Sequence, residues 1–99
     1  MIEVTKDGDK TIIIPSKNIV AVDADDMKSA VKIVLDKEPD AVAMDMKNVS
    51  MIDSMGIGVL IAIHNTLKKR GLSLELFNMT DNINHLLRTM RLHQHLILK

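Results

Sequence analysis

The chain contains no cysteine, tryptophan or tyrosine and only one phenylalanine. Without cysteine it can form no disulfide, no thiolate metal site and no thiol nucleophile. With almost no aromatic rings it is poorly suited to stacking on nucleic acid bases. The 13 Lys and Arg residues equal the 13 Asp and Glu residues in number, so no net charge indicates a nucleic acid or a membrane surface as partner.

Long apolar runs and a signal sequence are also missing. The N-terminus lacks the basic-then-apolar layout of a signal peptide, and no apolar stretch approaches the roughly 20 residues that span a bilayer. We therefore expect a cytoplasmic protein without direct membrane insertion. A length of 99 residues, 46% hydrophobic and 26% charged, predicts a single domain over residues 1–99.

Hydrophobic patterning predicts strands and helices in alternation after an initial β-hairpin. The hairpin turns at residues 7–9, and further strands are expected over 41–46 and 72–77, with 96–98 as a last short strand or a packed tail. Helical spacing of apolar residues predicts helices over about 23–38, 54–70 and 80–91. Residues 19–22 are apolar without a clear period, which leaves a third short strand and a surface loop both open.

Eight methionines stand in place of the missing aromatic residues. Most are expected to fill the core, and only Met55 is expected to be exposed. The core methionines predicted from apolar pattern positions are Met27, Met44, Met46 and Met90. Within residues 41–46 the smaller side chains Ala41, Ala43 and Asp45 share one face, against which we expect a helix to pack closely.

The segment Asp53-Ser54-Met55-Gly56-Ile57-Gly58 joins a strand pattern to a helix pattern. Asp53 and Ser54 fall at or next to the helix N-cap, where a short polar side chain accepts hydrogen bonds from unpaired N–H groups. The same N–H groups and the helix dipole favour a phosphate. Ser54 is thus either an ordinary cap or a hydroxyl placed to carry a phosphate. The two glycines are poor helix formers unless another backbone or a partner comes close.

Other clusters point to no catalytic or metal-binding residue and to no cofactor. The aspartates at 23, 25 and 26 lack the glycine and distal glutamate of a calcium loop, and His93 and His95 have no third ligand nearby in sequence. No histidine is placed beside Ser54 and no Gly-rich phosphate loop is present, so we expect no enzyme. Lys68-Lys69-Arg70 before Gly71 is typical of a helix C-terminus rather than of a phosphate-binding patch.

The run from Val49 to Leu60 resembles the central motif of STAS domains, above all the bacterial anti-sigma factor antagonists. The resemblance implies an α/β, STAS-like fold: a small mixed sheet of four or five strands with helices packed mainly on one face. It also implies a regulatory binding module whose Ser54 is phosphorylated by a partner anti-sigma factor, a GHKL-type serine kinase. A PP2C-type phosphatase is a further implied partner.

Two positions depart from the family pattern. Val20 stands where antagonists usually carry an aspartate that assists kinase binding, and Met55 replaces the second motif serine. The partner-binding residues that we expect are Val20, Asp53, Ser54, Met55, Gly56 and Gly58. The alternative function is a STAS subunit that is never phosphorylated and docks to a membrane transporter or a sensory complex. A small-molecule or nucleotide-binding module is the third class considered.

Overall fold

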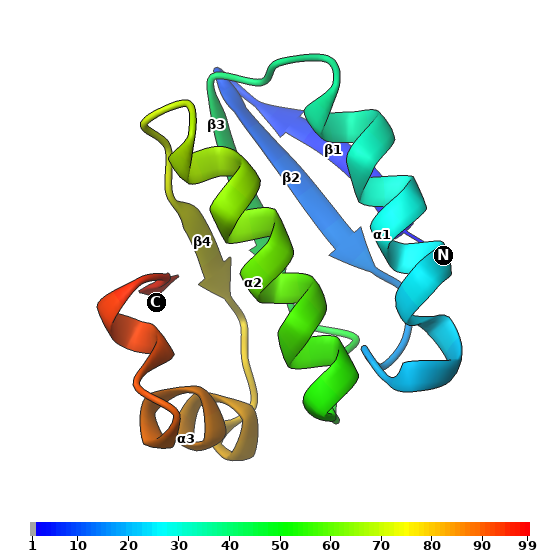
Figure 1. The fold of residues 1–99 in the computed structure, drawn as a ribbon, viewed down its shortest axis with the longest axis vertical. Coiled ribbons are helices and arrows are strands. Elements are labelled where there is room, and N and C mark those ends of the chain that lie inside the picture. Colours follow the sequence, from blue (N-terminus) through cyan, green and yellow to red (C-terminus); the bar gives the residue numbers. More distant parts are fainter. Residues whose placement is uncertain (1) are drawn as a thin grey trace.

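The computed structural model describes residues 2–99 as a five-stranded mixed sheet with the order β1-β2-β3-β4-β5 (Figure 1). Strands β1 (Ile2–Asp7) and β2 (Lys10–Pro15) form the expected antiparallel hairpin. Strands β3 (Ala41–Asp45), β4 (Leu74–Phe77) and β5 (Ile97–Leu98) then add in parallel. The sequence left residues 96–98 as either a short strand or a packed tail, and the structure shows the short strand β5 there.

Each parallel connection passes through a helix. The helices are α1 (Ala21–Leu35), α2 (Ser54–Lys68) and α3 (Asp81–Thr89), the last followed by the 3₁₀ helix η1 (Leu92–Gln94). Parallel crossovers share one hand, so successive helices fall on the same face of a sheet. Figure 1 shows α1 and α2 side by side across one face, with α3 beyond the end of β4. No helix within residues 2–99 is long and apolar enough to cross a membrane.

The core lies between the sheet and helices α1 and α2. Val42 and Met44 of β3 face the helices and belong to one buried cluster with Leu60 of α2. The expectation that a helix packs on the small face of this strand, with Ala43 and Asp45, is wrong. The helices cover the face with the larger side chains because burying those removes more apolar surface from water.

Residues 19–22 form neither a strand nor a simple loop. Ile19 makes one isolated parallel bridge to Ile52, and α1 already begins at Ala21. The helix starts two residues before its predicted start because its first N–H group, that of Ala21, has a hydrogen-bond acceptor far away in the sequence. This acceptor is Oδ2 of Asp53, at 2.9 Å.

The methionines divide between core and surface. Met27, Met44 and Met46 are buried as expected. Met90 is 48% exposed, so its predicted burial is wrong. The reason is that α3 ends at Thr89, and Arg91 adopts a left-handed backbone with φ of 60° that turns the chain out of the helix.

Replacing Met44 by alanine should lower the free energy of unfolding by about 2–5 kcal/mol, because a fully buried side chain leaves a cavity. Replacing Met90 by alanine should change the free energy of unfolding by less than about 0.5 kcal/mol. Urea unfolding followed by circular dichroism measures both values. Equal losses for the two variants would contradict the division of methionines between core and surface.

Candidate functional site

The motif segment is joined to the loop before α1. The Ile19 N–H donates to the Met51 carbonyl at 3.2 Å, and the Asp53 N–H donates back to the Ile19 carbonyl at 3.3 Å. The Asn18 side-chain oxygen accepts from the Ser50 N–H at 2.8 Å, from the Ser50 hydroxyl at 3.1 Å and from the Met51 N–H at 3.1 Å. We call residues 18–20 and 50–53 the paired loops. They hold the starts of α1 and α2 together at one end of the sheet.

Asp53 is the N-cap of α2, as predicted. Its Oδ1 accepts from the Gly56 N–H at 2.9 Å, while Oδ2 accepts from the Ala21 N–H of α1. These two hydrogen bonds, first to Gly56 and then to Ala21, lower the pKa of the Asp53 carboxyl below its ordinary value. One carboxylate therefore caps two helices, a role that its position in sequence reveals only for α2.

Ser54 is the first residue of α2 and is exposed. Within residues 2–99 its side chain forms no hydrogen bond or ion pair, since Asp53 supplies the cap. Of the two possibilities left open by the sequence, an ordinary cap is therefore excluded for Ser54. Its hydroxyl lies at the positive end of the helix dipole.

The two motif glycines have different reasons to be glycine. A Cβ on Gly56 would overlap the Ile19 carbonyl group and press on the Ile52 side chain, so the paired loops require glycine there. A Cβ on Gly58 would meet nothing within 4 Å. Gly58 is exposed, and its own chain gives no reason for a residue that weakens the helix.

Exposed apolar side chains surround this end of the molecule. Met55, expected at the surface, is 54% exposed, and Met51 of the paired loops and Val22 at the start of α1 are 58% and 89% exposed. Val20 is half-buried at the N-cap of α1 and makes no side-chain cap hydrogen bond. Met51 belongs to the motif run and Val22 to the apolar segment 19–22, but the sequence does not indicate that both are exposed near Met55. No local sequence signal marks the role of Asn18, because its partners lie 32 and 33 residues away.

Catalytic and metal-binding groups are not gathered at the motif. His64 follows Ser54 by ten residues, about 15 Å along α2. Asp23, one of the three aspartates considered as a metal site, forms an ion pair with Lys17 at 2.8 Å. Among residues 2–99 no three His, Cys, Asp or Glu side chains form a group able to hold a metal ion. What the site offers is an exposed hydroxyl, a helix N-terminus and an apolar rim.

The chain belongs to the STAS domain family, whose sequence model matches residues 1–99. An anti-sigma-B factor antagonist from Listeria monocytogenes is 31% identical over 78 residues, which cover 79% of this chain and 68% of that protein. The family resemblance of the motif is thereby confirmed, and within the family the similarity is to anti-sigma factor antagonists.

Solved structures share the fold. A putative anti-sigma factor antagonist from Thermotoga maritima superposes with a TM-score of 0.91 at 20% identity, over 98% of this chain and 84% of that one. The phosphorylated form of the Bacillus cell fate determinant SpoIIAA superposes with a TM-score of 0.69 at 10% identity, over 100% of this chain and 91% of that one. The predicted STAS-like fold, with its mixed sheet and helices on one face, is confirmed.

The two motif glycines should respond in opposite directions to the same substitution. Gly56→Ala should lower the free energy of unfolding by about 1–3 kcal/mol or more, because the new methyl group overlaps a backbone carbonyl. Gly58→Ala should raise it by about 1 kcal/mol, the gain in helix propensity at an uncrowded position. Chemical denaturation of the two variants beside the wild type measures both changes. A loss of stability in Gly58→Ala would show that this position is crowded.

Asp53→Asn should lower the melting temperature at pH 7 by several degrees, since the amide NH₂ cannot accept from a helix N–H. The Asp53 pKa lies below its ordinary value of 3.8 in the folded protein, so the carboxylate contributes its full stabilisation above about pH 5. That contribution disappears as the pH falls through the folded-state pKa. The difference in melting temperature between wild type and variant should therefore become smaller as the pH is lowered from about 5 to the lowest pH at which thermal unfolding can be recorded. A gap independent of pH would contradict the capping role.

Proposed function

We propose that the chain is a cytoplasmic partner-switching module. In this proposal the paired loops and the start of α2 bind an anti-sigma factor that is itself a GHKL-type serine kinase. The kinase phosphorylates Ser54, the complex dissociates, and a PP2C-type phosphatase restores the serine. The observation that carries the proposal is the exposed Ser54 hydroxyl, free of hydrogen bonds within residues 2–99, at the N-terminus of a helix already capped by Asp53.

The electrostatics of this position support a switch that leaves the fold intact. A phosphate on Ser54 would carry about −1.5 to −2 charges at neutral pH. The N-terminus of α2 tolerates such an anion because its N–H groups and dipole attract negative charge. The Asp53 carboxylate remains engaged with Gly56 and Ala21, so the caps do not depend on the state of Ser54. The added charge would act on the partner rather than on the core.

The surface around Ser54 supports recognition of the bare serine. Met55, Met51 and Val22 expose apolar side chains next to it in the chain or on the paired loops and the start of α1. Gly58, one helical turn after Ser54, leaves room for a partner backbone to come close. A partner fitted to this apolar surface would lose its contacts when a hydrated dianion appears at the centre.

The chemistry assigns the catalytic groups to the partner. Phosphorylation forms a bond between the Ser54 oxygen and the γ-phosphorus of ATP, breaks the bond from that phosphorus to the β-phosphate so that ADP leaves, and passes the hydroxyl proton to a base. Asp53 is the nearest carboxylate in sequence, but both its oxygens accept backbone N–H groups. The kinase must therefore bring the nucleotide and the base, and this chain acts by binding. Of the residues expected to bind the partner, Asp53 and Gly56 position the surface, while Ser54, Met55 and Gly58 present it.

Capture from the native cell lysate tests this function. Tagged wild-type protein should retain a GHKL-type serine kinase, and mass spectrometry should find part of Ser54 phosphorylated. Ser54→Asp should bind the captured kinase at least about tenfold more weakly, because its charge opposes the fitted surface. Ser54→Ala should bind it and accept no phosphate in a kinase assay.

The matched control is Ser73→Asp, which adds the same charge at an exposed serine before β4, outside the motif. It should bind the kinase like the wild type. Equal binding by Ser54→Asp and the wild type would contradict the switch. Capture of a membrane transporter subunit, with Ser54 always unmodified, would replace the proposal with the alternative docking function.

A further inference from the structure

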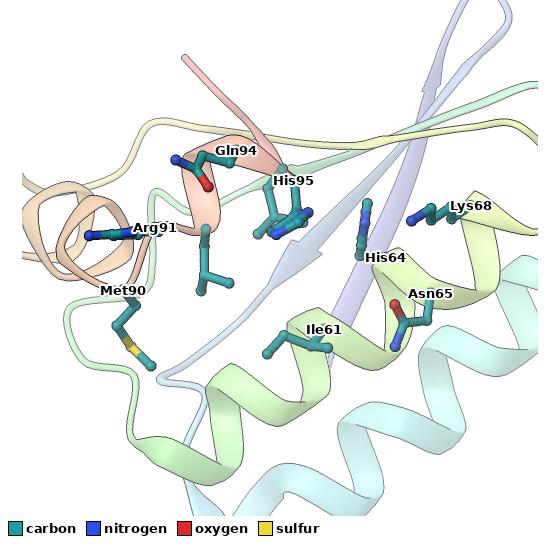
Figure 2. Close-up of a pocket in the computed structure, with 10 residues that line it drawn as sticks. Ile61, His64, Asn65, Lys68, Met90, Arg91, Gln94 and His95 are labelled. Atoms are coloured by element: carbon teal, nitrogen blue, oxygen red, sulfur yellow. The ribbon is translucent and has the colours of Figure 1, made fainter.

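A groove of about 480 Å³ lies between the second half of α2 and the segment that joins α3 to β5 (Figure 2). Its volume is within the range of small-molecule sites in proteins. Neither Ser54 nor Asp53 lines it. It brings together residues that the proposed function leaves unused, Lys68 from the end of α2 and Gln94 and His95 from the segment before β5.

The groove carries positive charge without a compensating carboxylate. Lys68 and Arg91 line it, together with His64 and His95, and no Asp or Glu of the described chain does. Within residues 2–99 neither Lys68 nor Arg91 forms an ion pair. Figure 2 shows Lys68 and His64 toward one end of the groove and Arg91 and Met90 toward the other, with His95 between them. Cations gathered without an acidic partner favour an anionic ligand.

The surroundings of the groove change the properties of His64. Burial first, and then the nearby His95 and Lys68, hold the pKa of the His64 imidazole below its ordinary value. The centroids of the His64 and His95 rings lie 6.0 Å apart. The His64 Nδ1 is buried and has no hydrogen-bond partner within the described residues. Buried nitrogens in proteins are usually hydrogen-bonded, so this unpartnered one is a second observation that favours a polar ligand in the groove.

The groove also has exposed apolar side chains. Ile61 and Met90 line it, and Figure 2 shows Ile61 between Lys68 and Met90. Met90 was expected in the core and instead faces this groove. A ligand that covered both side chains would remove apolar surface from water while its charged group met Lys68.

We propose that the groove binds an organic phosphate, a phosphate monoester with an apolar body. The phosphate group contacts Lys68, His64 and His95, and the apolar body lies over Ile61 and Met90. A phosphate monoester carries about −1.5 to −2 charges at neutral pH, which matches a phosphate position where the fixed cation Lys68 lies beside two imidazoles, with Arg91 as a second cation further along the groove. Protonated imidazoles favour the bound anion, but below about pH 6 the phosphate monoester itself takes up a proton and loses charge.

Phenyl phosphate is the test ligand, and nuclear magnetic resonance of the four histidine rings provides the readout. Saturating phenyl phosphate should raise the pKa of His64, because its protonated ring gains an anionic neighbour. It should also shift the ring resonances of His95, whereas the resonances of His85 and His93, which do not line the groove, should stay in place. Inorganic phosphate, which lacks the apolar body, should bind more weakly. The measurement uses the chain alone, so its outcome does not depend on the anti-sigma partner.

Two variants with equal net charge separate a specific site from general attraction. Lys68→Gln removes a cation that lines the groove and should weaken phenyl phosphate binding about tenfold. Lys69→Gln removes the neighbouring exposed cation, which lies outside the groove, and should bind like the wild type. Ile61→Ala should weaken binding of phenyl phosphate and leave that of inorganic phosphate unchanged.

A free metabolite and a lipid headgroup share this chemistry, and sedimentation with vesicles distinguishes them. Phosphatidylcholine vesicles with added phosphatidic acid should leave the protein in solution if the ligand is a free organic phosphate. Capture that requires phosphatidic acid and Lys68 would instead identify a lipid phosphate as the source. The proposal is overturned if neither His64 nor His95 responds to phenyl phosphate, if the resonances of all four histidines move alike, or if Lys68→Gln and Lys69→Gln bind equally well.

Discussion

The arrangement of this protein depends on one carboxylate. Asp53 accepts an N–H from the first turn of α2 with one oxygen and an N–H from the first turn of α1 with the other. Both helices cross the same face of the sheet, and their N-terminal N–H groups would otherwise lack partners at this end. Because Asp53 caps both helices, the neighbouring Ser54 is not needed as a cap, and its hydroxyl stays exposed.

The close approach of the Ile19 backbone to Gly56 also fixes how the starts of α1 and α2 meet. The single bridge between Ile19 and Ile52 brings two loops together, and α2 can begin there only if its third residue has no side chain. Asn18 adds three hydrogen bonds to the same junction. A rigid frame at the proposed phosphorylation site suits a switch that changes surface charge without moving the fold.

Helix α2 contributes to both proposed anion sites, Ser54 at its start and the groove along its second half. Different interactions favour the anion at each site. At the N-terminus, free N–H groups and the dipole favour a phosphate on Ser54 without any cationic side chain. Along the second half the dipole no longer favours an anion, so the cations of the groove come from side chains, including Lys68 and His64. Ser54 and His64, the nearest phosphate contact of the groove along α2, are ten residues or nearly three helical turns apart, which allows each anion to be bound independently.

Hydrophobic periodicity and capping act within a few residues, so the sequence alone predicts the three helices, the strands up to β4, the cap at Asp53 and the family motif. Three features are visible only in the folded protein: Asp53 also caps α1, residues 19–22 divide between a bridge and a helix start, and Met90 leaves the core. The groove likewise joins residues about 30 positions apart in sequence. Those features depend on contacts between distant segments, whose register no local pattern records.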